Sequence, residues 1–139
     1  MIYVLDSSFC ASCMLPDEKT AELEKIFLEV IADEEVYVPQ IWWCEMANIF
    51  KNNVARRRLS WAEVFRLNQC LLNYSFLTDS SFGGAYTEKL LEATRIYDLT
   101  AYDAAYLELA LRKRATVGTL DGRLKTACVK AGLTTLTTP

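Results

Sequence analysis

The sequence of 139 residues contains no histidine. This absence excludes a Ser-His-Asp triad, a Cys-His dyad and the paired histidines of zinc proteases, because each of them needs imidazole. The chain also lacks an apolar run near the ~18 residues that a membrane-spanning helix requires. Its first residues show no secretory-signal pattern, so we expect a cytoplasmic protein with no membrane association. Any catalysis must therefore depend on carboxylates, thiols, hydroxyls, lysines or a metal held by oxygen.

Positive charge is not in excess. The chain has 15 Lys and Arg residues against 18 Asp and Glu residues, for a formal net charge of −3. This balance argues against a protein that coats nucleic acid by charge alone. Hydrophobic residues make up 52% and charged residues 24%, which suits a packed globular chain. The length predicts a single domain over residues 1–139.

The five cysteines are odd in number, and without a signal sequence they indicate reduced thiols. Cys10 and Cys13 form a C-x-x-C motif directly after a predicted strand, so a thiol–disulfide protein is one alternative. The chain lacks the later strand-rich half that such a fold needs, which disfavours this alternative. A Cys₄ zinc site would need a second matching pair, and the other cysteines are scattered.

Short apolar segments alternate with helical patterns along the chain. Strands are expected at 2–5, 36–38, 75–78, 116–120 and 133–136. Helices are expected from Pro16, over 41–58, after a capping box formed by Ser60 and Glu63, over 85–97 and 101–114, and after Asp121. This alternation predicts an α/β fold, with a mostly parallel sheet covered by helices on both faces.

Four acidic residues differ from the others, which lie on polar faces or turns. Asp6 ends an apolar strand, Glu45 interrupts an apolar helical segment, Asp103 lies in the first turn of a helix, and Asp121 follows the fourth strand. Ligands of α/β sheets bind at the carboxyl ends of the strands, where three of these residues are expected. Each also has a structural alternative. Asp103 and Asp121 could cap helices, and Asp6 could accept backbone hydrogen bonds.

Capping does not explain why Asp6 and Glu45 interrupt apolar segments. Like charges that lie together raise one another's pKa unless a cation joins them. A group of carboxylates without histidine suits Mg²⁺ or Mn²⁺ better than zinc. The sequence therefore favours a site for a hard divalent ion.

Four segments resemble a known family. They are residues 4–8 (VLDSS), 45–48 (EMAN), 99–107 (LTAYDAAYL) and 119–124 (TLDGRL). In this order they resemble the motifs of PIN-domain proteins, in particular the VapC-type toxins of type II (VapBC) toxin–antitoxin systems. The resemblance extends over residues 2–136.

The resemblance implies a three-layer α/β/α fold whose five parallel strands have the order 3-2-1-4-5. It also implies a metal-dependent endoribonuclease, with Asp6, Glu45, Asp103 and Asp121 as catalytic residues and ligands of Mg²⁺, or of Mn²⁺ in its place. In this chemistry a metal-activated water attacks the phosphodiester and leaves a 5′-phosphate and a 3′-OH. A non-catalytic PIN module is the remaining alternative.

Other residues take supporting roles by the same resemblance. Ser8 and Thr119 belong to the two Asp motifs and are expected to support their carboxylates. Asn48 either positions the site by hydrogen bonding or packs against the sheet. Arg123, two residues after Asp121, is the expected contact for RNA phosphate, with further cations at helix ends such as Arg58 and Arg112.

The resemblance also implies partners. They are an RNA substrate, a second copy of the chain in a homodimer, and a cognate VapB-type antitoxin that lies across the active site. DNA would be bound only indirectly, through the antitoxin. The aromatic and apolar residues between Trp42 and Phe65 form the predicted groove for the antitoxin.

Overall fold

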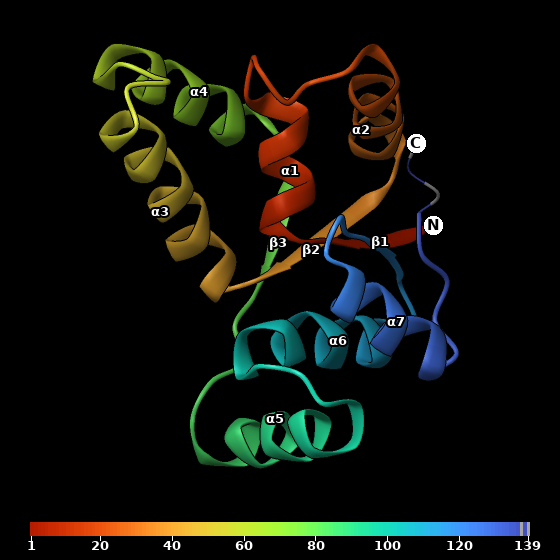
Figure 1. Ribbon diagram of the computed structural model, residues 1–139. Helices are drawn as coiled ribbons and strands as arrows, with labels where there is room; N and C mark the ends of the chain where they lie inside the picture. Colours follow the sequence, from red (N-terminus) through yellow and green to blue (C-terminus); the bar gives the residue numbers. More distant parts are fainter. Residues whose placement is uncertain (137, 139) are drawn as a thin grey trace.

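The computed structural model describes residues 1–136 and 138, and all of their side chains except that of Asp33. Its sheet has four parallel strands in the order β3-β2-β1-β4 (Figure 1). The strands are β1 (Ile2–Leu5), β2 (Glu35–Pro39), β3 (Phe76–Asp79) and β4 (Thr116–Gly118). The helices are α1 (Ser7–Met14), α2 (Ala21–Asp33), α3 (Ile41–Ala55), α4 (Trp61–Asn73), α5 (Gly84–Tyr97), α6 (Ala101–Lys113) and α7 (Gly122–Lys130).

Helices cover both faces of the sheet, which confirms the predicted α/β class. Helices α1 and α2 lie on one face, and α6 and α7 lie on the other, with α5 outside α6 (Figure 1). Helices α3 and α4 form a hairpin on the side of α1. Over the described residues, every helix is too short or too polar to cross a membrane.

The predicted fifth strand is not formed. Residues 133–136 contribute one isolated parallel bridge, between Val117 and Thr135. The Val117 amide donates to the Thr134 carbonyl at 2.9 Å, and the Leu136 amide donates to the Val117 carbonyl at 2.8 Å. The segment thus lies beside β4, where a fifth strand of order 3-2-1-4-5 would lie. Strand β4 has only three residues, so it offers little backbone for further pairing.

The first helix was not predicted, and the second begins later than expected. Helix α1 starts directly after β1, with Asp6 as its N-cap. The helix expected from Pro16 begins instead at Ala21, where the Thr20 side chain accepts a hydrogen bond from the Leu23 amide. The capping box of Ser60 and Glu63 is confirmed at the start of α4. Side-chain caps therefore define these helix starts more sharply than apolar periodicity does.

Gly118 allows β4 to pack closely against β1. A Cβ atom at this position would lie 2.5 Å from Leu5 Cδ2 and 3.0 Å from Leu136 Cδ1. Leu5 is fully buried in the core, so it has little room to move away. A side chain at position 118 would therefore displace Leu5 at the end of β4, immediately before Thr119 and Asp121.

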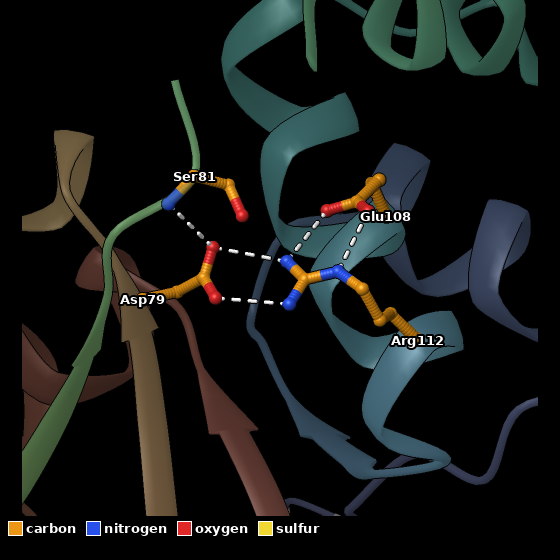
Figure 2. Close-up of polar contacts among 4 residues, drawn as sticks. All are labelled: Asp79, Ser81, Glu108 and Arg112. Atoms are coloured by element: carbon orange, nitrogen blue, oxygen red, sulfur yellow. Dashed lines mark hydrogen bonds and ion pairs between the residues drawn. The ribbon is translucent and has the colours of Figure 1, made fainter. Parts of the chain in front are cut away.

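An ion-pair network fastens α6 to the end of β3 (Figure 2). Both terminal nitrogens of Arg112 donate to the Asp79 carboxylate at 2.9 Å. Arg112 also donates to Glu108, one turn earlier on α6, at 2.9 and 3.0 Å. The Ser81 amide also donates a hydrogen bond to the Asp79 carboxylate, at 3.2 Å. Arg112 is thus held by two carboxylates, one on β3 and one on α6.

Candidate acidic site at the carboxyl edge of the sheet

Asp6 is the most buried of the four predicted carboxylates, with 4% of its surface exposed. Its Oδ1 accepts hydrogen bonds from the Phe9 amide at 2.7 Å and from the Ser8 hydroxyl at 2.8 Å. Its Oδ2 accepts from the Thr119 hydroxyl. Burial raises the pKa of Asp6 above its usual value; these hydrogen bonds oppose the rise, and the charge of Asp121 adds to it. The carboxylate is therefore oriented on both oxygens.

Thr119 joins the ends of β1 and β4. It is buried, and while its hydroxyl donates to Asp6 it accepts a hydrogen bond from the Asp121 amide at 2.9 Å. Asp121 is also the N-cap of α7, because its Oδ1 accepts from the Leu124 amide at 2.9 Å. One hydroxyl group therefore contacts both the carboxylate of Asp6 and the backbone of Asp121.

Asp103 lies in the first turn of α6, where Thr100 accepts a hydrogen bond from the Asp103 amide at 3.2 Å. The pKa of Asp103 lies above its usual value, because partial burial and the charge of Asp121 raise it more than Arg123 lowers it. Asp103, Asp121 and Arg123 thus act on one another electrostatically. Arg123, on the first turn of α7, is a cation close enough to lower the pKa of Asp103.

Glu45 reaches the site from α3. Its Oε2 accepts hydrogen bonds from the Ser7 hydroxyl at 3.0 Å and from the Tyr106 hydroxyl. Burial is the main reason why the pKa of Tyr106 lies well above its usual value, and the neighbouring Glu45 raises it further. The phenol therefore stays protonated and donates. Ser7 lies next to Asp6, and the charge of Asp6 also acts on Tyr106. Glu45 therefore borders the same group of residues.

The sequence reasoning did not assign a role to Ser7 or Tyr106. Both lie inside the segments that carry the family resemblance, VLDSS and LTAYDAAYL. Tyr106 follows Asp103 by three residues on α6, a spacing that puts the two side chains on one face of a helix. That spacing is the signal that could have identified it.

The carboxylates are neighbours, but they do not converge on one point. Among the residues that the structure describes, no group of three or more Asp, Glu or Cys side chains is gathered into a metal-binding cluster. Oε1 of Glu45 and Oδ2 of Asp121 accept no hydrogen bond from the described residues, and are thus available to a ligand. The donor set consists of oxygen, which fits Mg²⁺ or Mn²⁺.

Asn48 lies away from the sheet. It is exposed, and it lines a groove of about 430 Å³ between α3 and α4, together with Trp61 and Phe65. The expectation that Asn48 packs against the sheet is therefore wrong. Arg58, one of the helix-end cations, is held in an ion pair with Asp17.

The C-x-x-C motif belongs to the core. Cys10 and Cys13 are buried in α1, and both are free thiols. Burial raises the pKa of Cys13 to about 12 and raises that of Cys10 well above its usual value. Thiol–disulfide chemistry needs a thiolate, and hence a lowered pKa. The structure therefore disfavours the thiol–disulfide alternative.

Comparison with known proteins settles the family. The family model described as the PIN domain matches residues 3–130. The chain belongs to the PIN-domain family. No curated protein matches the sequence of this PIN domain.

Solved structures agree with this PIN fold. The crystal structure of PAE2754 from Pyrobaculum aerophilum is 20% identical, with a TM-score of 0.70, and the match covers 97% of this chain and 83% of that one. VapBC2 from Rickettsia felis, bound to a promoter DNA fragment, is 13% identical, with a TM-score of 0.70 and 98% of each chain covered. FitAcB from Neisseria gonorrhoeae is 17% identical, with a TM-score of 0.67 and coverages of 99% and 97%. At these identities the likeness concerns the fold of the PIN domain.

Proposed function

We propose that this PIN domain is the toxin of a type II toxin–antitoxin pair and that it acts as an endoribonuclease. Membership of the PIN family supports a nuclease, and two of the similar structures, VapBC2 and FitAcB, carry the names of toxin–antitoxin complexes. The observation that carries the proposal is the buried carboxylate of Asp6, which shares the Thr119 hydroxyl with Asp121 at the carboxyl edge of the sheet.

We infer that Asp6, Glu45, Asp103 and Asp121 hold Mg²⁺, or Mn²⁺ in its place. A divalent ion would offset the like charge that Asp121 exerts on Asp6 and on Asp103. Such an ion would lower the pKa of a bound water molecule, so that hydroxide is available close to neutral pH. The protein holds Glu45 through Ser7 and Tyr106, and it holds Asp6 through Ser8 and Thr119.

The expected products follow from the residues present. Attack by the ribose 2′-OH usually needs an acid–base pair, and the chain has no histidine to supply one. Attack by water leaves a 5′-phosphate and a 3′-OH. Arg123, which acts on Asp103 electrostatically, is the residue that we expect to contact a phosphate of the RNA.

A cleavage assay tests the nuclease. The purified protein should cleave single-stranded RNA with Mg²⁺ or Mn²⁺, and EDTA should stop the reaction. Asp6→Asn and Asp121→Asn should abolish cleavage while circular dichroism shows a folded protein. Full activity of folded Asp121→Asn, or products that end in a 2′,3′-cyclic phosphate, would contradict the mechanism.

We further propose that a segment of the cognate antitoxin occupies the groove between α3 and α4. Apolar side chains line this groove, and two aromatic ones at its edge are exposed, Trp61 by 53% and Phe65 by 65%. An amphipathic helix buries such a surface. Phe65→Glu should abolish co-purification with the co-expressed antitoxin and leave RNA cleavage intact, whereas Glu29→Gln on α2 should affect neither. Unchanged co-purification of Phe65→Glu would contradict this assignment.

A homodimer is proposed as the active form, and light scattering on the purified protein gives the mass that distinguishes a dimer from a monomer.

DNA binding is expected only from the complex with the antitoxin. In a gel-shift assay the isolated PIN domain should leave promoter DNA unbound. Binding of that DNA by the isolated domain would contradict the assignment.

A further inference from the structure

A second pocket, of about 400 Å³, is lined by residues that are next in the sequence to Glu45 and Asp103. It is formed by the start of α3, the connection after β3, the α5 helix and the start of α6. These segments lie together on one side of the molecule (Figure 1). The lining residues used below are Gln40, Cys44, Ser81, Phe82, Tyr86 and Tyr102.

Three residues that line the pocket directly precede residues of the acidic site in the sequence. Cys44 lines it directly before Glu45 in α3, and Tyr102 lines it directly before Asp103 in α6. Ala105 lines it directly before Tyr106, whose hydroxyl donates to Glu45. The pocket and the acidic site thus share the starts of α3 and α6, so a polymer whose phosphate lies at the carboxylates can extend a neighbouring group toward the pocket.

The chemistry of the pocket differs from that of the acidic site. None of the residues that line it is Asp, Glu, Lys or Arg. Two aromatic side chains at the pocket are strongly exposed, Phe82 by 78% and Tyr102 by 61%. A neutral aromatic pocket beside a charged site complements a nucleotide, which has a neutral flat base next to a charged phosphate.

We propose that this pocket binds an unpaired nucleobase of the RNA, next to the phosphate that is cleaved. The assignment rests on the proposed nuclease function and adds a substrate preference to it. Phe82 and Tyr102 supply faces on which a base can stack. Gln40, whose side chain makes no capping bond to α3, and Ser81 supply polar groups for the edge of the base. A base held in a double helix cannot enter the pocket, which therefore selects an unpaired base.

Substitution of the two aromatic residues tests the pocket. Phe82→Ala and Tyr102→Ala should each raise the KM for single-stranded RNA about tenfold, because each removes a stacking partner. Their kcat should change less, since the carboxylates stay in place. Leu91→Ala is the matched control: Leu91 is an exposed apolar residue of α5 that lies next to the lining residue Leu90 but does not line the pocket itself. It should leave KM unchanged.

Base stacking can also be measured without cleavage. A single-stranded RNA with 2-aminopurine should lose fluorescence when it binds the wild-type protein in EDTA, and the Phe82→Ala/Tyr102→Ala variant should abolish this quenching. Unchanged KM and unchanged quenching in that variant would overturn the proposal.

A change from dimer to monomer in the same variant, seen by light scattering, would also overturn the proposal, because the pocket would then be a contact between copies. If the wild-type protein does not cleave RNA but still quenches the 2-aminopurine, the nuclease function fails and the base pocket stands. If the wild-type protein cleaves RNA and the pocket variants behave as wild type, the nuclease function stands and only the base-pocket assignment fails.

Discussion

The hydroxyl of the buried Tyr106 donates a hydrogen bond to the carboxylate of Glu45, and so joins α6 to α3 beside the acidic site. Ser7 donates to the same carboxylate oxygen. Both donors contact Oε2, while Oε1 accepts no hydrogen bond from the described residues. The protein thus orients Glu45 through one oxygen and leaves the other for a ligand.

Removal of the Tyr106 hydroxyl should weaken the site without unfolding the protein. In Tyr106→Phe the ring still fills the core, but Glu45 loses one of its two donors. We expect RNA cleavage to fall about 10–100-fold and more Mg²⁺ to be needed for half-maximal rate, as for other residues that orient metal ligands. A magnesium titration of the rate measures both. Tyr3→Phe, which removes a hydroxyl bonded to Met1, is the control and should behave as wild type.

The Thr119 hydroxyl should matter more than the methyl group of that residue. Thr119→Val keeps the volume but removes the bridge between Asp6 and the Asp121 amide, so we expect cleavage to fall about 10–100-fold. Thr119→Ser keeps the hydroxyl and should retain most of the activity. Initial rates with a fluorescent RNA measure the difference. Equal loss in both variants would point to packing rather than to the hydrogen bonds.

The network of Asp79 and Arg112 should stabilise the fold in a pH-dependent way. Partial burial acts to raise the pKa of Asp79, but the hydrogen bonds from Arg112 and Ser81 outweigh it and leave the pKa below its usual value. A lowered pKa in the folded state adds stability above the pKa of the unfolded chain, and this stability is lost as the pH falls through the folded value.

Asp79→Asn should therefore lower the free energy of unfolding by about 1–2 kcal/mol at pH 7, and by less near pH 3. Urea denaturation at the two pH values gives the comparison. Glu29→Gln, whose exposed side chain lies 3.9 Å from Lys25, should change stability little at either pH. An equal loss for Asp79→Asn at both pH values would exclude a contribution from its charge.

The five thiols should divide into two groups by reactivity. Cys44 and Cys70 are exposed, whereas Cys10, Cys13 and Cys128 are buried. Iodoacetamide at pH 8 should therefore alkylate Cys44 and Cys70 in the folded protein, and all five residues after denaturation. Peptide mass spectrometry identifies the sites. Fast alkylation of Cys10 in the folded protein would revive the thiol–disulfide alternative.

The sequence alone predicted much of the fold. Alternating apolar segments indicated a parallel sheet between helices, and the cap residues Thr100 and Ser60 marked helix starts that the structure confirms. Asp121 is indeed an N-cap, and Asp6 accepts a backbone hydrogen bond from Phe9, as the structural alternatives predicted for these two residues. Capping does not exclude a second role, because Asp121 uses only Oδ1 as a cap. These features are local, so a few neighbouring residues determine them.

Only the tertiary structure decided how the acidic site is held together. The contacts of Glu45 with Ser7 and Tyr106 join residues 38 and 61 positions apart, and the bond from Thr119 to Asp6 spans 113 positions. The reduction of the fifth strand to one bridge, and the pocket beside Tyr102, also arise from packing between distant elements. Sequence periodicity reports which face of an element is buried, but not which side chains of other elements meet it there. These side-chain contacts depend on how the helices pack on the sheet, and they distinguish an oriented acidic site from four separate carboxylates.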